Sequence, residues 1–329
     1  TGGADVESIT SIKFNAPRVN ASKNRAVTAT DYEALILANY AGAESVSVWG
    51  GEDNDPPFYG KVLISLKPYT GFTISDATKN SIKTNILKSK QGITIIPEFV
   101  DPTYFYVNIA ANIVYNSSIT TLSSDQIKSQ VNIAITDYFS TNLQKFNKSY
   151  IHSALTNAIL AKNSSITSAL VNLKLQRRII PTLNTINIFS GDTSIKFRNP
   201  LKPGSIISSY FYTVINSVTF LVKITDLPDT SPASDTGSGT LRLINIVNDS
   251  VLLTNIGTIN YGTGVVSLTN ITPAGLPAGV TDIRITGSIQ ENNYNLVVSR
   301  NEVLVQDDTT TNKIGGLVAG TTVTVTALI

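Results

Sequence analysis

Length, composition and charge exclude several classes of protein. The chain has 329 residues, more than one hydrophobic core usually organises, so two or three domains are expected. Charged residues make up only 15% of it, against about 25% in ordinary globular proteins. The net charge is +2, and no cluster of basic residues occurs beyond Arg177 and Arg178. The sequence therefore lacks the basic surface typical of nucleic-acid binding, and no nucleic-acid partner is expected. Covering an uncharged polar surface costs little desolvation, which suits an assembly component.

Two absences narrow the chemistry further. The sequence contains no Cys, which excludes disulfides and cysteine-based metal or redox sites. It has no apolar run near the length of a membrane span and no signal peptide at its start, so no membrane insertion is expected. The chain begins with Thr1 and contains no Met. We therefore expect a fragment of a longer gene product.

The first elements are an extended arm, a helix and two strands. Residues 1–30 read as an arm with one strand-like run, Ile9 to Phe14. Thr30 followed by Glu33 predicts a capping box that opens a helix. Beyond Gly42 the apolar residues alternate, which predicts two strands on either side of the turn GGEDNDPPFYG. The apolar residues of the helix and strands are Tyr32, Leu35, Ile36, Tyr40, Val46, Val48, Val62, Ile64 and Leu66.

Residues 60 to 176 follow a regular order of elements. After the strand that ends this hairpin, Ser75 caps a helix, and a capping box of Ser123 and Gln126 opens a second one. The turn dipeptide Asp101-Pro102 joins two strands between these helices. With an extra helix set aside, the order is βαββαβ, which predicts an α+β, ferredoxin-like domain. The remaining predicted elements are the strands Ile93–Phe99, Tyr104–Tyr115 and Ser168–Leu175 and the extra helix Ser149–Ala161.

Beyond Pro181 the helical period disappears. Short alternating runs recur with turn residues between them, the pattern of a β-rich sandwich or barrel-like domain. The sequence therefore predicts three regions: an N-terminal arm at 1–30, an α+β region at 31–181 and a β-rich C-terminal domain at 182–329. The last segment, Gly316 to Ile329, is uncharged and alternates Val with Thr. We expect it to be a paired strand, covered by its own β domain or by a second subunit.

No group of residues predicts catalysis, a cofactor or a metal. The single histidine, His152, has apolar neighbours, and no GxSxG motif supplies a nucleophile for a serine triad. Glu52, Asp53 and Asp55 form an acidic cluster, but Pro56 stands where an EF-hand loop requires Gly. The cluster reads as a solvated hairpin tip. We expect a protein that is not an enzyme, with no catalytic, cofactor-binding or metal site.

Aromatic residues leave two interpretations open. Trp49, the pair Phe58-Tyr59 and the run Tyr210 to Tyr212 have the residue types that anchor protein interfaces. Aromatic residues on strands more often belong to the core.

A resemblance gives these features a context. The APR segment, the helix start RAVTATDYEAL and the hairpin GGEDNDPPFYGKVLISLKP resemble the baseplate J-like family, structural proteins of contractile phage tails. Within that family, these segments most resemble a C-terminal portion of the inner-baseplate wedge proteins of T-even-type phages. The resemblance covers roughly residues 10 to 180 and leaves the β-rich region unmatched.

The resemblance implies a structural subunit of a baseplate wedge that joins wedges around the central hub and rearranges during sheath contraction. Its implied partners are other copies of itself, as a homodimer within a ring, and other wedge proteins. The implied location is the virion tail baseplate, after assembly in the host cytoplasm. A carbohydrate-binding adhesin, or a tail-associated receptor-binding module, is the alternative that the many strands and abundant Asn, Thr and Tyr leave open.

Overall fold

The computed structural model describes residues 13, 25–54, 56–230, 233–290, 295–307, 313–314, 317–318 and 320–328. The predicted strand-like run Ile9 to Phe14 lies outside these residues, apart from Lys13. The chain forms two compact units. The first unit comprises Thr1–Tyr104, Leu143–Lys148 and Val298–Val303, and the second comprises Phe105–Asn142, Ser149–Val297 and Leu304–Ile329. Each unit contains both helices and strands. The predicted α+β class is confirmed.

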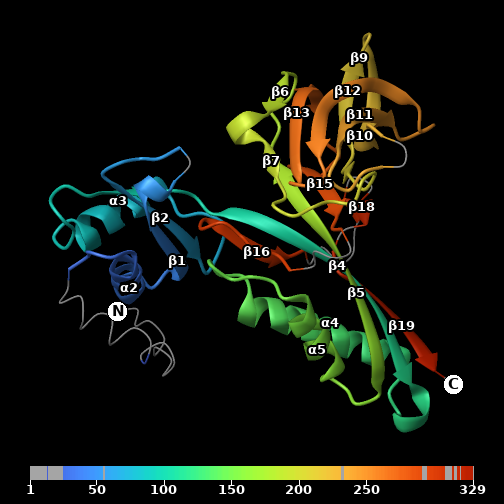
Figure 1. Cartoon of the computed structure of the whole chain (residues 1–329), viewed down its shortest axis with the longest axis horizontal. Helices are drawn as coiled ribbons and strands as arrows, with labels where there is room; N and C mark the ends of the chain where they lie inside the picture. Colours follow the sequence, from blue (N-terminus) through green and yellow to red (C-terminus); the bar gives the residue numbers. More distant parts are fainter. Residues whose placement is uncertain are drawn as a thin grey trace. The chain divides into compact units, whose positions relative to one another are not determined.

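In the first unit, helices cover one face of a three-stranded sheet (Figure 1). The strand order is β1-β2-β3, with β1 and β2 antiparallel and β2 and β3 parallel. The core between helices and sheet includes Leu35, Ile36, Val46, Ile64 and Leu87. The elements are α2 (Ala29–Asn39), β1 (Ala43–Gly50), a 3-10 turn (Gly51–Asp53), β2 (Lys61–Pro68), α3 (Asp76–Ser81), a π-helical turn (Ile82–Leu87) and β3 (Ile96–Phe99).

Helix α2 begins two positions earlier than the capping box of Thr30 and Glu33 predicts. The residue at its N-cap is Thr28, whose hydroxyl accepts a hydrogen bond from the Asp31 backbone N–H. The Asp31 carboxylate in turn accepts from the Thr28 backbone N–H at 2.8 Å. The prediction was wrong because the same spacing of a hydroxyl and an acid occurs twice. Glu33 instead accepts a hydrogen bond from the backbone N–H of Val48 at 3.1 Å.

The opposite face of this sheet is covered by a distant segment of the same unit. Ser45 Oγ accepts a hydrogen bond from the Phe146 backbone N–H at 3.2 Å, and Asn147 donates to Ser47 Oγ at 3.5 Å. Phe146 itself is buried. Small serine side chains on β1 let the 143–148 segment approach closely, so this sheet is enclosed on both faces.

The second unit is built on a large sheet and two helices. This sheet has 14 described strands. Ten of them follow the order β16-β4-β5-β15-β8-β10-β11-β12-β13-β6, and β7, β9, β14 and β19 pair at its sides. Among the described residues, no helix is long and apolar enough to cross a membrane.

The helices and turns from Thr103 onward are α4 (Ser124–Asn142), α5 (His152–Leu160) and 3-10 turns at Ser117–Ile119 and Gly191–Thr193. The strands are β4 (Thr103–Asn116), β5 (Ile166–Ile179), β6 (Asn187–Phe189), β7 (Ile195–Lys196), β8 (Ile207–Ser208), β9 (Phe211–Ile215), β10 (Val218–Pro228), β11 (Ser238–Asn245), β12 (Val251–Asn260), β13 (Val265–Ile271), β14 (Pro273–Gly275), β15 (Ile283–Ser288), β16 (Glu302–Gln306), β17 (Lys313–Ile314), β18 (Leu317–Val318) and β19 (Thr322–Leu328).

The predicted ferredoxin-like arrangement does not form. That arrangement requires the four strands of the βαββαβ order to share one sheet, whereas β2 and β3 lie in the three-stranded sheet and β4 and β5 in the large one. The link at Asp101-Pro102 is not a reversing turn. A residue before Pro favours extended backbone, so the chain continues forward here and does not fold back into a hairpin.

One end of the large sheet carries the helices. In it β4 pairs antiparallel with β5 and parallel with β19, while α4 lies against β19 and α5 against β5. The predicted capping box of α4 is confirmed, because Gln126 Oε1 accepts from the Ser123 N–H and Ser123 Oγ from the Gln126 N–H. The C-terminal segment is a paired strand, as predicted. Of the two covers expected for it, its own β-rich domain was wrong, because its partner is β4 of the predicted α+β region, and cover by a second subunit stays a prediction.

The remaining strands confirm that the C-terminal region is β-rich. Strands β10, β11, β12 and β13 follow one another as antiparallel neighbours. The buried Asp226 on β10 anchors the preceding loop, since its carboxylate accepts from the backbone N–H groups of Gly204 and Ile206 and from the Tyr261 hydroxyl. The boundary at 181 and 182 stays a prediction about regions of sequence, because the compact units follow a different division.

Candidate functional site

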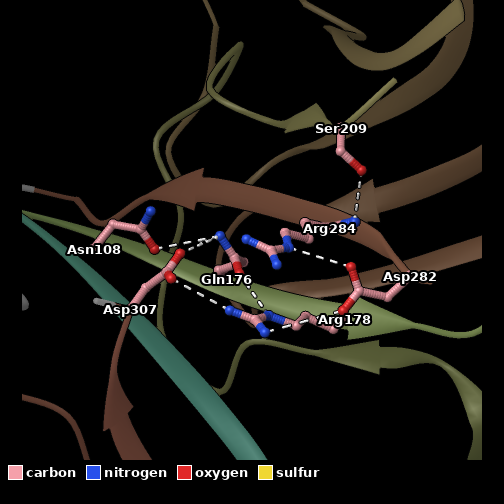
Figure 2. A network of polar contacts seen from close by, with 7 residues as sticks. All are labelled: Asn108, Gln176, Arg178, Ser209, Asp282, Arg284 and Asp307. Carbon is pink, nitrogen blue, oxygen red and sulfur yellow. Dashed lines mark hydrogen bonds and ion pairs between the residues drawn. The ribbon is translucent and has the colours of Figure 1, made fainter. Parts of the chain in front are cut away.

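The most developed group of polar side chains lies inside the second unit (Figure 2). We call it the polar node. It brings together residues of β4, β5 and β15, the residue that follows β8 and the residue that follows β16. Its members are Asn108, Gln176, Arg178, Ser209, Asp282, Arg284 and Asp307.

Asp307 is the most buried acid of the polar node, with its side chain only 1% exposed. Its carboxylate accepts hydrogen bonds from Gln176 Nε2 at 3.0 Å and from an Arg178 guanidinium nitrogen at 3.3 Å. Its backbone N–H donates to the carbonyl of Val107 on β4 at 3.0 Å. Asp307 therefore ties the segment that follows β16 to two strands that lie far away in the sequence.

Arg178 is held from several sides. Its guanidinium lies 3.5 Å from the ring centroid of Tyr106, and its Nε donates to Gln176 Oε1 at 2.9 Å. A carboxylate oxygen of Asp282 lies 4.0 Å from it. Burial lowers the pKa of Arg178, and nearby acids partly oppose this effect. Burial also raises the pKa of Tyr106.

Arg284 connects the node to the strand on its other side. Its Nε lies 3.2 Å from Asp282 Oδ1, and its backbone N–H donates to Ser209 Oγ at 2.9 Å. The groups shown in Figure 2 are cations, carboxylates, amides and the Ser209 hydroxyl, and hydrogen bonds and ion pairs join them to one another. The arrangement cross-links these strands through side-chain contacts.

The structure places His152 at the start of α5 in a structural contact. Its Nδ1 lies 3.3 Å from the Tyr150 hydroxyl, and its backbone N–H donates to Asn295 Oδ1 at 3.1 Å. Tyr150 belongs to a buried aromatic group with Tyr138 and Phe139. Burial lowers the pKa of His152, which favours its neutral form.

The acidic hairpin tip forms an ion pair within the first unit. Glu52 and Asp53 lie in the 3-10 turn after β1, and Asp53 Oδ2 lies 3.1 Å from an Arg300 guanidinium nitrogen. Asp55 lies outside the described residues. Within the part of the chain that is described, no group of three or more His, Asp or Glu side chains is placed to hold a metal ion. The turn depends on Gly51, where an added Cβ would stand 2.0 Å from the Phe58 carbonyl oxygen.

The aromatic candidates divide between core and surface. Trp49 and Phe211 are buried in the core. Tyr59, by contrast, is 80% exposed and Phe58 42% exposed. The core interpretation holds for Trp49 and Phe211, and the interface interpretation stays a prediction for Phe58 and Tyr59.

Sequence reasoning noted Arg177 and Arg178 only as a small basic pair. The acidic partner of Arg178 is Asp307, which lies 129 residues further along the chain. The one available signal was two adjacent arginines just beyond the predicted strand Ser168–Leu175 in a chain poor in charge, because charges that become buried need partners.

Two family models match parts of the sequence. Residues 28–100 match the family model for C-terminal domain I of the baseplate structural protein gp6, and residues 103–178 match that for C-terminal domain III. These similarities support a structural protein of a phage tail baseplate, and the predicted location in the virion tail baseplate is confirmed.

One curated relative is the baseplate wedge protein gp6 of Enterobacteria phage T4, 24% identical over 210 residues. The match covers 64% of this chain and only 30% of that protein. This supports the baseplate wedge class, and these relatives are structural proteins. A solved structure of the anti-feeding prophage baseplate is also similar, with a TM-score of 0.37, 17% identity and coverage of 53% of this chain and 39% of that one.

Proposed function

We propose that this chain is a non-enzymatic part of a baseplate wedge that joins neighbouring wedges around the central hub. The observation that carries the proposal is the similarity of residues 28–178 to two C-terminal domains of gp6. The side chains support it, because the polar node cross-links strands and His152 makes structural contacts.

The mechanism we infer is mechanical. During sheath contraction the wedges change their arrangement, and the chain carries that change through interfaces that have two alternative packings. Its partners in this proposal are a second copy, as a homodimer within a ring, and other wedge proteins.

Co-assembly tests the proposal. The chain is produced together with other baseplate wedge proteins, and the complexes are separated by size and imaged by electron microscopy. We expect a defined complex that contains the chain and at least one other wedge protein. If the chain stays apart from all of them and binds polysaccharides on a glycan array, the adhesin alternative replaces this proposal.

Self-association is tested separately. Homo-oligomers most often close with twofold symmetry, so sedimentation velocity at tens of micromolar should show a dimer. A strict monomer at those concentrations contradicts the homodimer while leaving the wedge assignment to the co-assembly experiment.

A further inference from the structure

Strand β19 has one edge that no described strand covers. Its seven residues pair in parallel with β4, from Thr322 opposite Ala110 to Leu328 opposite Asn116. Among the described residues, β4 is its sole strand partner. An unpaired edge presents a row of backbone N–H and C=O groups, which another strand satisfies.

Two other edge strands of the described chain, β1 and β3, are protected, whereas β19 is not. Natural edge strands carry charge or Pro to block further pairing. The edge strand β3 contains Pro97 and Glu98, and on β1 the N–H of Val48 donates to the Glu33 carboxylate. Strand β19, with the sequence TVTVTAL, has no charged residue and no Pro.

The two faces of β19 define the side chains that an added strand needs. Val323 is 6% exposed on the face that α4 covers. Thr322, Thr324 and Thr326 are exposed on the other face. Because neighbouring strands share the alternation of the sheet, the matching strand has small or β-branched apolar residues at alternate positions and uncharged polar residues between them.

Helix α4 decides which kind of strand fits. It lies against β19, and α5 lies against β5, which is two strands away from β19. Two strand spacings of about 4.8 Å match the distance of about 8–10 Å at which helices pack. If two copies paired through β19, one spacing of about 4.8 Å would separate strands that each carry an α4 helix on the same face. That is too close for the two helices.

We propose that the outer edge of β19 accepts an extended segment of a different polypeptide as an additional strand, in the manner of β-strand addition. The segment is uncharged, alternates β-branched apolar with small polar residues, and has no helix packed over it. The inference deepens the proposed function and rests on it for the nature of the partner, another subunit of the baseplate. The edge itself is a property of this chain alone.

A peptide tests the edge without knowledge of the natural partner. The probe is a fluorescent peptide with the sequence of residues 322–328, attached to a short ethylene-glycol tag for solubility. Two further versions carry backbone N-methyl groups on alternate residues, one version for each set. A strand added to an edge directs only one set of its N–H groups at that edge. We expect the unmodified peptide and one methylated version to bind the whole chain, and the other version to bind at least tenfold more weakly.

Fluorescence anisotropy reads out this binding. Equal binding by both methylated versions contradicts strand addition, and so does no binding at millimolar peptide. Co-assembly with wedge proteins is a separate measurement, so failure of the peptide to bind overturns this inference without touching the proposed function.

Substitutions in the chain locate the peptide. Thr324→Lys combined with Thr326→Lys places charges on the exposed face of the edge strand and should weaken binding at least tenfold. The matched control is Thr258→Lys, since Thr258 is also exposed but lies on β12, which has strand partners on both sides. Equal weakening by the control contradicts the location.

A final arm tests the choice of occupant. The chain has no Cys, so Thr324→Cys provides a unique thiol on β19. We expect oxidation to leave this thiol free, with no disulfide-linked dimer. Rapid formation of a disulfide-linked dimer that is abolished by Thr326→Lys would show that a second copy occupies the edge, which overturns the inference.

Discussion

The two ends of the β4 and β5 ladder differ in how they meet the rest of the protein. Where Tyr106 pairs with Gln176, the strands enter the polar node and are surrounded by buried charges. Where Ala110 pairs with Asn172, the ladder continues into β19, which carries no charge. One end is closed by specific side-chain contacts, and the other ends in an open backbone edge.

This difference shows how one sheet separates internal cohesion from attachment. A buried ion pair is often no more stabilising than apolar packing, but removing one of its members leaves a costly unpaired charge. The polar node therefore enforces one arrangement of five segments that are distant in the sequence. The open edge of β19 has no network of side-chain contacts. It offers backbone N–H and C=O groups, with which an added strand of matching alternation pairs. Experiments that damage each end separately distinguish these roles.

The largest effect is expected at the polar node. Asp307→Ala removes the acceptor for Gln176 and Arg178 and leaves a buried cation less compensated. We expect a loss of about 3–5 kcal/mol in the free energy of unfolding, measured with urea. The control is Lys223→Ala, which breaks a surface pair with Asp249 and should cost less than about 1 kcal/mol. Similar losses of stability in both variants would contradict the prediction that the polar node stabilises the fold more than a surface ion pair does.

The second prediction compares the two faces of β19. Val323→Asp places a carboxylate on the buried face against α4, and we expect a loss of about 2–4 kcal/mol. Thr324→Asp, one residue along on the exposed face, should cost less than about 1 kcal/mol. Thermal unfolding of both variants checks the difference. Equal melting temperatures would mean that α4 does not protect this strand in solution.

The sequence predicted local elements well because their signals are local. The Ser75 cap and the Ser123 and Gln126 capping box lie within one helical turn and are confirmed. Strand pairing was not predictable in the same way, because a period of two marks a buried face but does not name the neighbouring strand. β4 thus left the expected ferredoxin-like sheet and paired with β19, from the far end of the chain.

The candidate site shows the same limit. The sequence indicated neither catalysis nor a metal, and it listed aromatic residues without separating buried Trp49 from exposed Tyr59. The polar node stayed hidden because Arg178 finds Asp282 and Asp307 only after several strands have come together.

The third prediction concerns Tyr261, away from both ends of the ladder. Its hydroxyl donates to the buried Asp226 carboxylate at 2.7 Å. Tyr261→Phe should cost about 1.5–3 kcal/mol, the usual range for a hydrogen bond to a charged group. Urea unfolding measures the loss, and Tyr212→Phe, on a half-exposed tyrosine, is the control.

The same tyrosine makes stability depend on alkaline pH. Burial and the bond to Asp226 raise the pKa of Tyr261 above its ordinary value of 10.0, so the folded state keeps the proton longer than the unfolded state does. The contribution is complete below about pH 10 and is lost as the pH rises further. Tyr261→Phe should lose stability less steeply above pH 10. Tyr150 and the other buried tyrosines are present in both proteins, so the difference between the two slopes reports on Tyr261. Equal slopes above pH 10 in parent and variant would contradict the raised pKa of Tyr261.

The smallest effect is expected for His152, the one histidine of the chain. His152→Ala removes a contact with the Tyr150 hydroxyl and should cost less than about 1 kcal/mol while leaving co-assembly intact. Burial lowers the pKa of His152 below 6.5, so its contribution is present above about pH 6.5 and is lost as the pH falls through the lowered value. With no second histidine, the difference between parent and variant between pH 7 and about pH 5 isolates this group. Loss of co-assembly in a well-folded His152→Ala variant would instead place the histidine at an interface and weaken the case that attachment depends on the open edge.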